Sequence, residues 1–142
     1  MRAKLSFLLV SLSKNRFKVM LNLYLDLSIL IGLVVIYEAR YILNTASVPI
    51  NRIAIITSLV EFTWMIISIT ALFKLPLSAV QILVPTLYIT HNLIGWAYGF
   101  ILAARQQEED FKVTIPRWYA IFSYTFGVVF TVLCIFVSYN SL

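Results

Sequence analysis

The sequence predicts an all-α membrane protein, a four-transmembrane-helix bundle with an N-terminal interfacial amphipathic helix. Of the 142 residues, 61% are hydrophobic and only 12% are charged, whereas a soluble domain carries about 25% charged residues to face water. Four apolar stretches each reach the length of about 20 residues that crosses the hydrocarbon core of a bilayer. The connections between them are short, so the 142 residues leave no room for a separate water-soluble domain.

Residues 1–18 are the first predicted element, a basic amphipathic segment. At helical spacing its leucines share one face and its polar residues share the other: Leu5, Leu8, Leu9 and Leu12 against Lys4, Ser11, Lys14 and Lys18. A helix of this kind lies in the membrane interface with its basic face toward the headgroups. The alternative is a frayed basic tail. No A-x-A-like site follows the short apolar run, which argues against a cleaved secretory signal.

Residues 19–142 form the predicted transmembrane domain, with spans at about 20–42, 52–73, 78–104 and 116–139. Turn-forming residues at 44–49 separate the first two spans, and Asn51 is a suitable N-cap for the second. The connection at 74–78 is tight, so spans two and three should be antiparallel neighbours. Residues 105–117 are the hydrophilic loop of the chain. Pro116 suits a first helical turn, and Pro85 is expected to kink the third span.

Orientation follows the distribution of lysine and arginine, which are enriched in cytoplasmic segments. Six basic residues fall on one predicted side: Arg2, Lys4, Lys14, Arg16, Lys18 and Lys74. Five fall on the other: Arg40, Arg52, Arg105, Lys112 and Arg117. The small excess places both termini in the cytoplasm, with the protein in a plasma or inner membrane. The expected partners are the lipid bilayer and other membrane subunits or further copies of the chain, and not nucleic acid.

Five ionisable side chains fall within the predicted spans, where each charge costs about 2.5 to 3.5 kcal/mol on insertion scales. They are Asp26, Glu38, Arg40, Glu61 and His91. Glu38 and Arg40 lie within about one turn of a boundary and are interpreted as a local ion pair that reaches water. Asp26 lies about 8 to 10 Å from the inner boundary and is a weaker candidate for a site.

Glu61 and His91 are the stronger candidates for a proton, ion or substrate site. Glu61 lies about 12 Å into the second span, on a polar stripe with Thr57, Ser58, Trp64 and Ser68. His91 falls near the same depth in the third span, on a face that includes Tyr88 and Asn92. A contact between Glu61 and His91 would allow proton exchange near neutral pH. The alternative is an interhelical hydrogen bond that only holds the helices together.

Two patterns of small residues indicate helix packing. Gly95 and Gly99 form a G-x-x-x-G, which allows helices to approach closely in lipid. The fourth span carries a seam of small residues at helical spacing: Gly127, Thr131, Cys134 and Ser138. Both patterns predict contacts with neighbouring helices.

Missing motifs limit the chemistry that the sequence predicts. One cysteine and one histidine cannot form a disulfide, a zinc cluster or a bis-histidine haem site within the chain. No nucleophile elbow or phosphate-binding loop occurs. We therefore expect a protein that is not an enzyme and has no cofactor of its own. The first hypothesis is a non-catalytic accessory or structural subunit of a membrane complex. The alternative is an oligomeric, proton- or cation-coupled small transporter using Glu61 and His91. A third is a subunit that lends His91 to a shared haem or quinone site.

Overall fold

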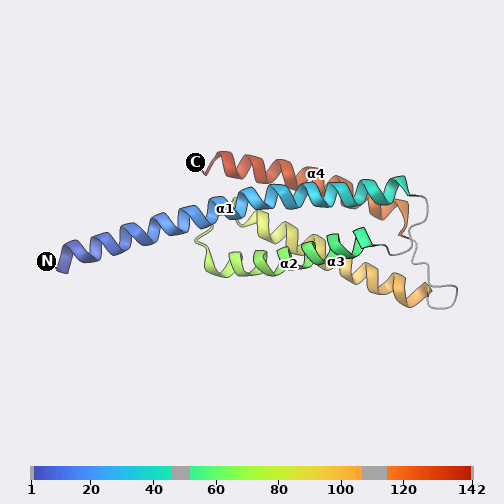
Figure 1. Cartoon of the computed structure of the whole chain (residues 1–142), viewed down its shortest axis with the longest axis horizontal. Helices are drawn as coiled ribbons and strands as arrows, with labels where there is room; N and C mark the ends of the chain where they lie inside the picture. Colours follow the sequence, from blue (N-terminus) through green and yellow to red (C-terminus); the bar gives the residue numbers. More distant parts are fainter. Residues whose placement is uncertain (1, 46–51, 107–114, 142) are drawn as a thin grey trace.

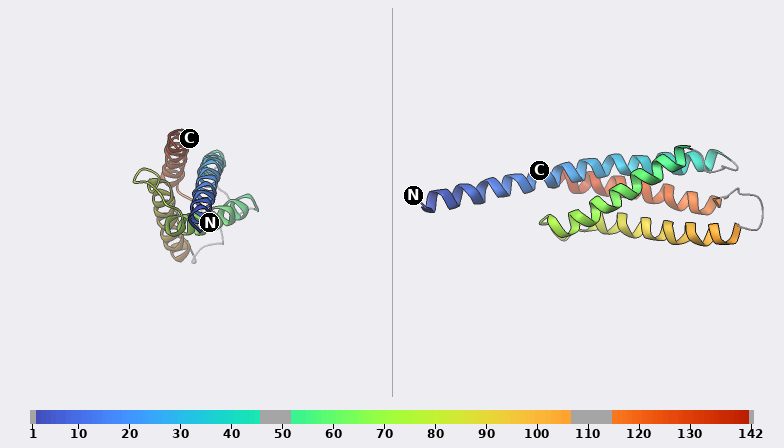
Figure 2. Two further views of the ribbon diagram at one scale, coloured as in Figure 1. Left: turned by 90° about the vertical axis from the view of Figure 1, so that its left-hand side faces the viewer. Right: turned by 60° about the horizontal axis from the view of Figure 1, so that its bottom comes forward.

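Four helices make up the fold, and the all-α class predicted from the sequence is confirmed. The computed structural model describes residues 2–45, 52–106 and 115–141, with side chains from residue 15 onward except at 54, 103, 105 and 106. The helices are α1 (Arg2–Asn44), α2 (Arg52–Lys74), α3 (Leu83–Gln106) and α4 (Arg117–Tyr139). They form an elongated bundle (Figure 1), across which α2 runs obliquely (Figure 2). Within these three ranges there is no β-strand. The Asn51 cap and the acidic part of the 105–117 loop lie outside the described residues.

α1 is a single continuous helix of 43 residues. The sequence divides this stretch into an interfacial segment and a first span, but the structure shows no break between them. At about 1.5 Å per residue, a helix of this length extends about 65 Å, roughly twice the thickness of the hydrocarbon core. Its N-terminal part extends past the other three helices (Figures 1 and 2). That this part lies in the membrane interface remains a prediction, because its side chains lie outside the described set before residue 15.

The tight connection between α2 and α3 has a specific local cause. The Ser78 backbone N–H donates to Gln81 Oε1 at 2.8 Å, and the Gln81 backbone N–H lies 3.4 Å from Ser78 Oγ. This reciprocal pair is a capping box, which satisfies backbone donors at the start of a helix. Regular α-helix then begins at Leu83 and not at Ser78. Pro85 consequently lies in the first turn of α3, where its missing N–H breaks no helical bond, and the predicted mid-helix kink is wrong.

Apolar side chains cover the outside of the bundle, and several polar ones are buried within it. Large exposed apolar residues occur on all four helices, among them Leu33, Ile56, Leu93 and Val132. The buried polar residues are Ser28, Thr57, Ser68, His91, Asn92 and Thr131. Three helical segments, residues 15–44, 55–74 and 117–139, are long and apolar enough to cross a membrane. Such exposed apolar surface is unfavourable in water and suits lipid, so these features indicate an integral membrane protein in contact with the bilayer.

Glycines bring α1 and α4 into close contact, and this pair forms the main packing interface of the bundle. A Cβ atom added at Gly32 would collide with Thr131 Oγ1 and would lie 3.3 Å from Thr131 Cα. A Cβ atom added at Gly127 would lie 2.8 Å from Ile36 Cγ1 and 3.1 Å from the Ile36 backbone nitrogen. Two of the predicted seam residues, Gly127 and Thr131, thus face α1, and Cys134 on the same helix is fully buried. Lipid supplies no hydrophobic force between helices, so helices in a membrane are held together by close packing. Small residues at the interface allow the backbones to approach closely enough for it.

Candidate functional site

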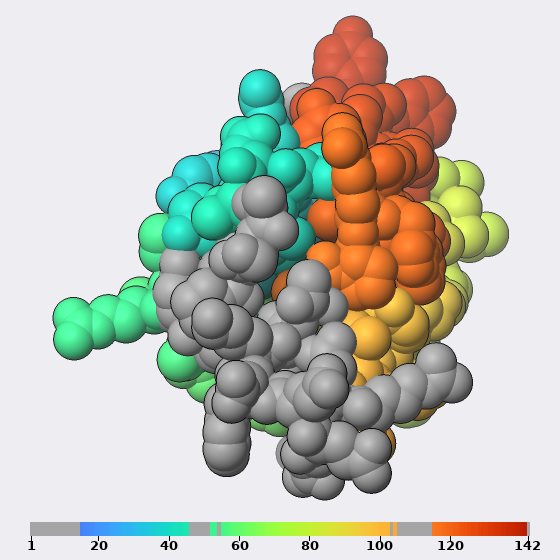
Figure 3. All heavy atoms as spheres, turned by 90° about the vertical axis from the view of Figure 1, so that its right-hand side faces the viewer, coloured from blue at the N-terminus to red at the C-terminus, as the bar shows by residue number. Residues whose placement is uncertain are grey.

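A cavity of about 600 Å³ lies among the four helices. It occupies the half of the bundle formed by the C-terminal parts of α1 and α3 and the N-terminal parts of α2 and α4. Figure 3 views this end, where all four helices reach the surface. The polar and aromatic side chains that line it are Glu38, Ser58, Glu61, Phe62, His91, Asn92, Trp96, Tyr98, Tyr119 and Ser123.

Two glutamates from different helices meet in this cavity. The side chains of Glu38 on α1 and Glu61 on α2 both line it and lie close enough to interact with each other. When one of the two is protonated, its O–H can donate to the other, because an ionised carboxylate only accepts hydrogen bonds. Two adjacent carboxyl groups share a proton in this way because both cannot easily be ionised at short separation. A carboxyl pair of this kind can take up and release a proton.

Glu38 is a site residue that cannot be recognised from its distance to the predicted membrane boundary. It lines the cavity beside Val35 and Ala39, while Arg40 is exposed and no described contact joins it to Glu38. Depth along a helix gives the distance from the boundary and says nothing about which neighbour a side chain faces. Helical spacing does contain that information. Glu38 lies three residues after Val35 and seven after Ile31, both buried, which places it on the packing face of α1.

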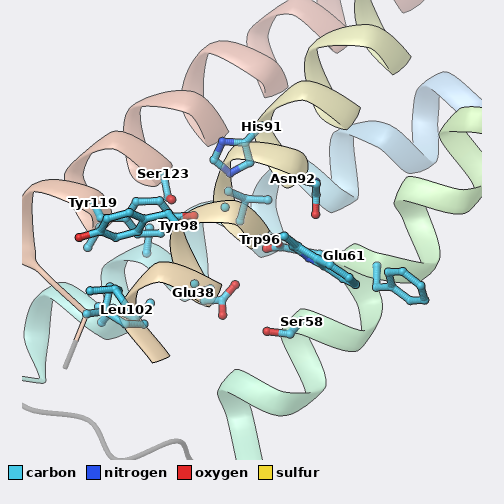
Figure 4. Close-up of a pocket in the computed structure, with 18 of the residues that line it drawn as sticks. Glu38, Ser58, Glu61, His91, Asn92, Trp96, Tyr98, Leu102, Tyr119 and Ser123 are labelled. Atoms are coloured by element: carbon cyan, nitrogen blue, oxygen red, sulfur yellow. The ribbon is translucent and has the colours of Figure 1, made fainter. Parts of the chain in front are cut away.

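His91 forms another part of the cavity wall. Its ring stacks on Phe126 of α4, with centroids 3.8 Å apart and planes 3° from parallel, and lies 5.5 Å from the ring of Phe122. The side chain is 6% exposed, and Nδ1 is buried without a hydrogen-bond partner. Glu61 and His91 thus line the same cavity, but among the described contacts the partner of Glu61 is Glu38. Figure 4 shows Glu38 and Ser58 facing each other across the cavity, with His91 and Asn92 farther along its wall.

Tyr88 and Asn92 hold the site in position. The Tyr88 hydroxyl donates to the backbone carbonyl of Glu61 at 3.3 Å, and Tyr88 is fully buried. Asn92 lines the cavity, and its Nδ2 donates to the carbonyl of Tyr88 at 3.1 Å. The Tyr88 bond joins α3 to α2 at the depth of the carboxyl pair, and the Asn92 bond lies within α3. Tyr88 is a positioning residue, since it lies behind the cavity and does not line it.

Two other predicted site residues lie elsewhere in the bundle. Trp64 stacks on Tyr24 of α1, with ring centroids 5.5 Å apart, and the Tyr24 hydroxyl donates to Ser68 at 3.1 Å. Asp26 accepts a hydrogen bond from Ser138 of α4 at 3.0 Å, and Asp26 is exposed. Both contacts join α1 to a neighbouring helix. The structure brings together Glu61, His91 and Asn92, and leaves Trp64 and Asp26 outside the cavity.

The glycines of the G-x-x-x-G make room for the cavity. Nothing lies within 4 Å of a Cβ atom added at Gly99, and a Cβ atom at Gly95 would meet only the side chain of Tyr119. Both glycines line the cavity. Gly95 thus allows a close contact with Tyr119 of α4, whereas Gly99 makes no such contact with the residues that the structure describes. Larger residues at these positions would project into the space beside the carboxyl pair.

Metal binding receives no support from the described side chains, where no three His, Cys, Asp or Glu residues come together as a group of ligands. The fold and the cavity thus define a small polytopic helical membrane protein with a carboxyl pair in its interior. No protein-family model, curated protein or solved structure matches this chain.

Proposed function

We propose that this chain is a four-span membrane protein that exchanges protons for cations at the Glu38–Glu61 pair and thereby transports a cation. The meeting of two carboxyl groups from different helices in the lining of one cavity carries this proposal. Ionisable groups within a membrane are costly and commonly mark proton or ion pathways. The described lining contains no lysine or arginine that would neutralise the pair. Its negative charge is therefore left for a proton or a bound cation.

The proposal includes α3 as the fourth span. α3 is less apolar than the three segments described above as long and apolar enough to cross a membrane, because it carries His91 and Asn92. Both of these residues are buried, whereas Leu87, Leu93 and Phe100 are exposed on the same helix. The polar groups thus face the bundle and the apolar ones face outward, as expected for a helix surrounded by lipid on one side. With four spans, both termini lie on one side, which the basic residues suggest is the cytoplasm.

Transport is tested in liposomes that contain a trapped pH-sensitive dye and start with an acidic interior. External Na⁺, K⁺ or ethidium is added in turn, and loss of the pH gradient is recorded. With the wild-type protein we expect at least one of these cations to accelerate the loss, because cation entry releases the proton. The double variant Glu38→Gln/Glu61→Gln should respond as protein-free liposomes do, since it carries no titratable carboxyl in the cavity.

Asp26→Asn is the matched control for this measurement. Asp26 is a carboxylate on the same helix as Glu38, but it contacts Ser138 outside the cavity. Its variant should keep the wild-type response. Equal acceleration in the wild type and the double variant, or no acceleration by any of the three cations, contradicts the transport proposal.

A second candidate function is an accessory subunit of a larger membrane complex. One feature of α1 supports it: Phe17, Val19, Met20 and Leu23 are exposed on the part of the helix near the free N-terminal extension. Apolar side chains at this place can pack against a helix of another protein. In this case Glu61→Gln and His91→Ala would impair assembly of the complex or the protein level. Neither variant would change transport, because the protein would have no transport activity of its own.

The accessory function predicts a stable partner in mild detergent. We expect a second membrane protein to co-purify in a fixed ratio and to be lost when Val19 and Met20 are both changed to serine. The matched control is the change of Val129 and Val132 to serine, since these two residues are exposed on α4. Recovery of the wild-type chain alone as a monomer contradicts this function.

A further inference from the structure

Aromatic rings form much of the cavity wall around the carboxyl pair. Trp96 stacks on Phe62 with centroids 4.9 Å apart, and Tyr98 stacks on Tyr119 at the same separation. Each stacked pair fixes the orientation of its rings before any ligand binds. A volume of about 600 Å³ lies within the range of about 300 to 1,000 Å³ for sites that enclose a drug-sized molecule. The cavity is much larger than a single desolvated metal ion requires.

The charge of the cavity suits one positive charge. Glu38 and Glu61 together hold one negative charge when they share a proton, and the lining residues that the structure describes include no basic side chain other than His91. Aromatic faces attract cations, and they favour weakly hydrated organic cations over small inorganic ions. His91 adds a flat ring held by Phe126 at one end of the cavity. Carboxyl pair, ring faces and volume point to the same class of ligand.

We infer that the cavity binds a singly charged organic cation with aromatic or bulky apolar substituents, whose charged centre lies at Glu38 and Glu61 and whose substituents lie against Trp96, Tyr98 and Tyr119. This inference rests on the proposed cation site and specifies its ligand. Binding requires the negative charge of the pair, and a second proton on the pair removes it. The affinity should therefore rise with pH, by at most about tenfold per pH unit where one proton is displaced.

Other titratable groups near the pair belong to α3 and α4. They are Tyr88, His91 and Tyr98 from α3 and Tyr119 from α4. From α1 and α2 the described titratable groups are the two glutamates themselves. Protonation of His91 would add a positive charge to the wall and weaken cation binding as the pH falls. It therefore acts in the same direction as protonation of the carboxyl pair.

The test is equilibrium binding of tetraphenylphosphonium to the full chain in mild detergent, at acidic and alkaline pH. We expect saturable binding that is tighter at alkaline pH. Glu38→Gln/Glu61→Gln should weaken it by about 100-fold, the scale seen when a buried charge loses its partner. The single variant Glu61→Gln should bind far better than the double one, because its amide donates to the remaining carboxylate and one negative charge persists. Trp96→Leu should weaken binding by about fivefold or more.

Tetraphenylborate is the matched control ligand, since it has the same shape and the opposite charge. Equal binding of the two ions to the wild-type protein would show hydrophobic partitioning and would overturn the inference without any variant. Wild-type affinity in a monodisperse double variant would overturn it as well, and Asp26→Asn should bind like the wild type. Saturable binding without cation-driven proton flux supports this ligand class and contradicts transport. Flux without tetraphenylphosphonium binding supports transport and contradicts this ligand class.

Discussion

Replacement of Gly32 by alanine is expected to destabilise the bundle, although alanine is the better helix former. The added methyl group collides with Thr131 Oγ1 and comes within 3.3 Å of Thr131 Cα and of Phe130. The helices must separate or the side chains must leave their preferred rotamers, which costs about 1 to 3 kcal/mol. The measurement is the free energy of unfolding, or the midpoint of thermal unfolding, of the purified protein in mild detergent.

Gly99→Ala is the matched control for Gly32→Ala. It makes the same chemical change in a helix, but no atom lies within 4 Å of the new methyl group. This variant should be as stable as the wild type, or more stable by up to about 1 kcal/mol from helix propensity. Thr131→Ala combined with Gly32→Ala should recover part of the loss, since it removes the colliding oxygen. Equal stability of the Gly32 and Gly99 variants would show that α1 and α4 are not packed as described.

Phe130→Ala should produce the second large effect. Phe130 is 1% exposed, and its ring lies 5.3 Å from that of Tyr88 and 5.4 Å from that of Phe126. Truncation leaves a cavity between α3 and α4 and costs about 3 to 5 kcal/mol. It also removes the support for the ring on which His91 stacks. We expect a large drop in thermal stability in detergent, accompanied by weaker tetraphenylphosphonium binding in the fraction that remains folded.

Phe136 provides the comparison on the same helix. It is 58% exposed on the outer surface of α4, where lipid or detergent replaces any contact that is lost. Phe136→Ala should therefore change stability by no more than about 0.5 kcal/mol. A similar loss in both variants would place the two rings in similar surroundings, contrary to the packing described above.

The number of helices and their approximate limits follow from the sequence because hydropathy along the chain decides both. Apolar runs interrupted by turn residues must become separate helices in lipid, and the ends of α2 and α4 lie within one residue of the predicted spans. The start of α3 is less accurate, since hydropathy does not distinguish the capping box at Ser78 and Gln81 from the helix that follows it. The length of α1 was likewise not apparent, because the change from basic to apolar residues at 18–20 does not interrupt the helix.

The candidate site was only partly predictable from the sequence. Matched depth correctly placed Glu61 and His91 in one region of the bundle, but it could not give their rotation about the helix axes. The rotation of α1 was equally hidden: it is set by the contacts of Gly32 and Gly127 between α1 and α4, and it places Glu38 in the cavity lining. The partner of His91 was missed for a similar reason. Phe126 has no distinguishing feature in an aromatic-rich span until the packing of α3 on α4 is known.

α3 has one polar and one apolar face, and this affects how the chain inserts into the membrane. A segment that carries His91 and Asn92 partitions poorly from the translocation machinery into lipid when it is alone, because polar residues near the centre of a helix disfavour insertion. α2 precedes it by a short, capped connection and is apolar enough to insert first. Tyr88 can then bond to the backbone of Glu61 on a helix that is already in the membrane. We expect α2 and α3 to enter the bilayer as one hairpin, because contacts with α2 favour the insertion of α3.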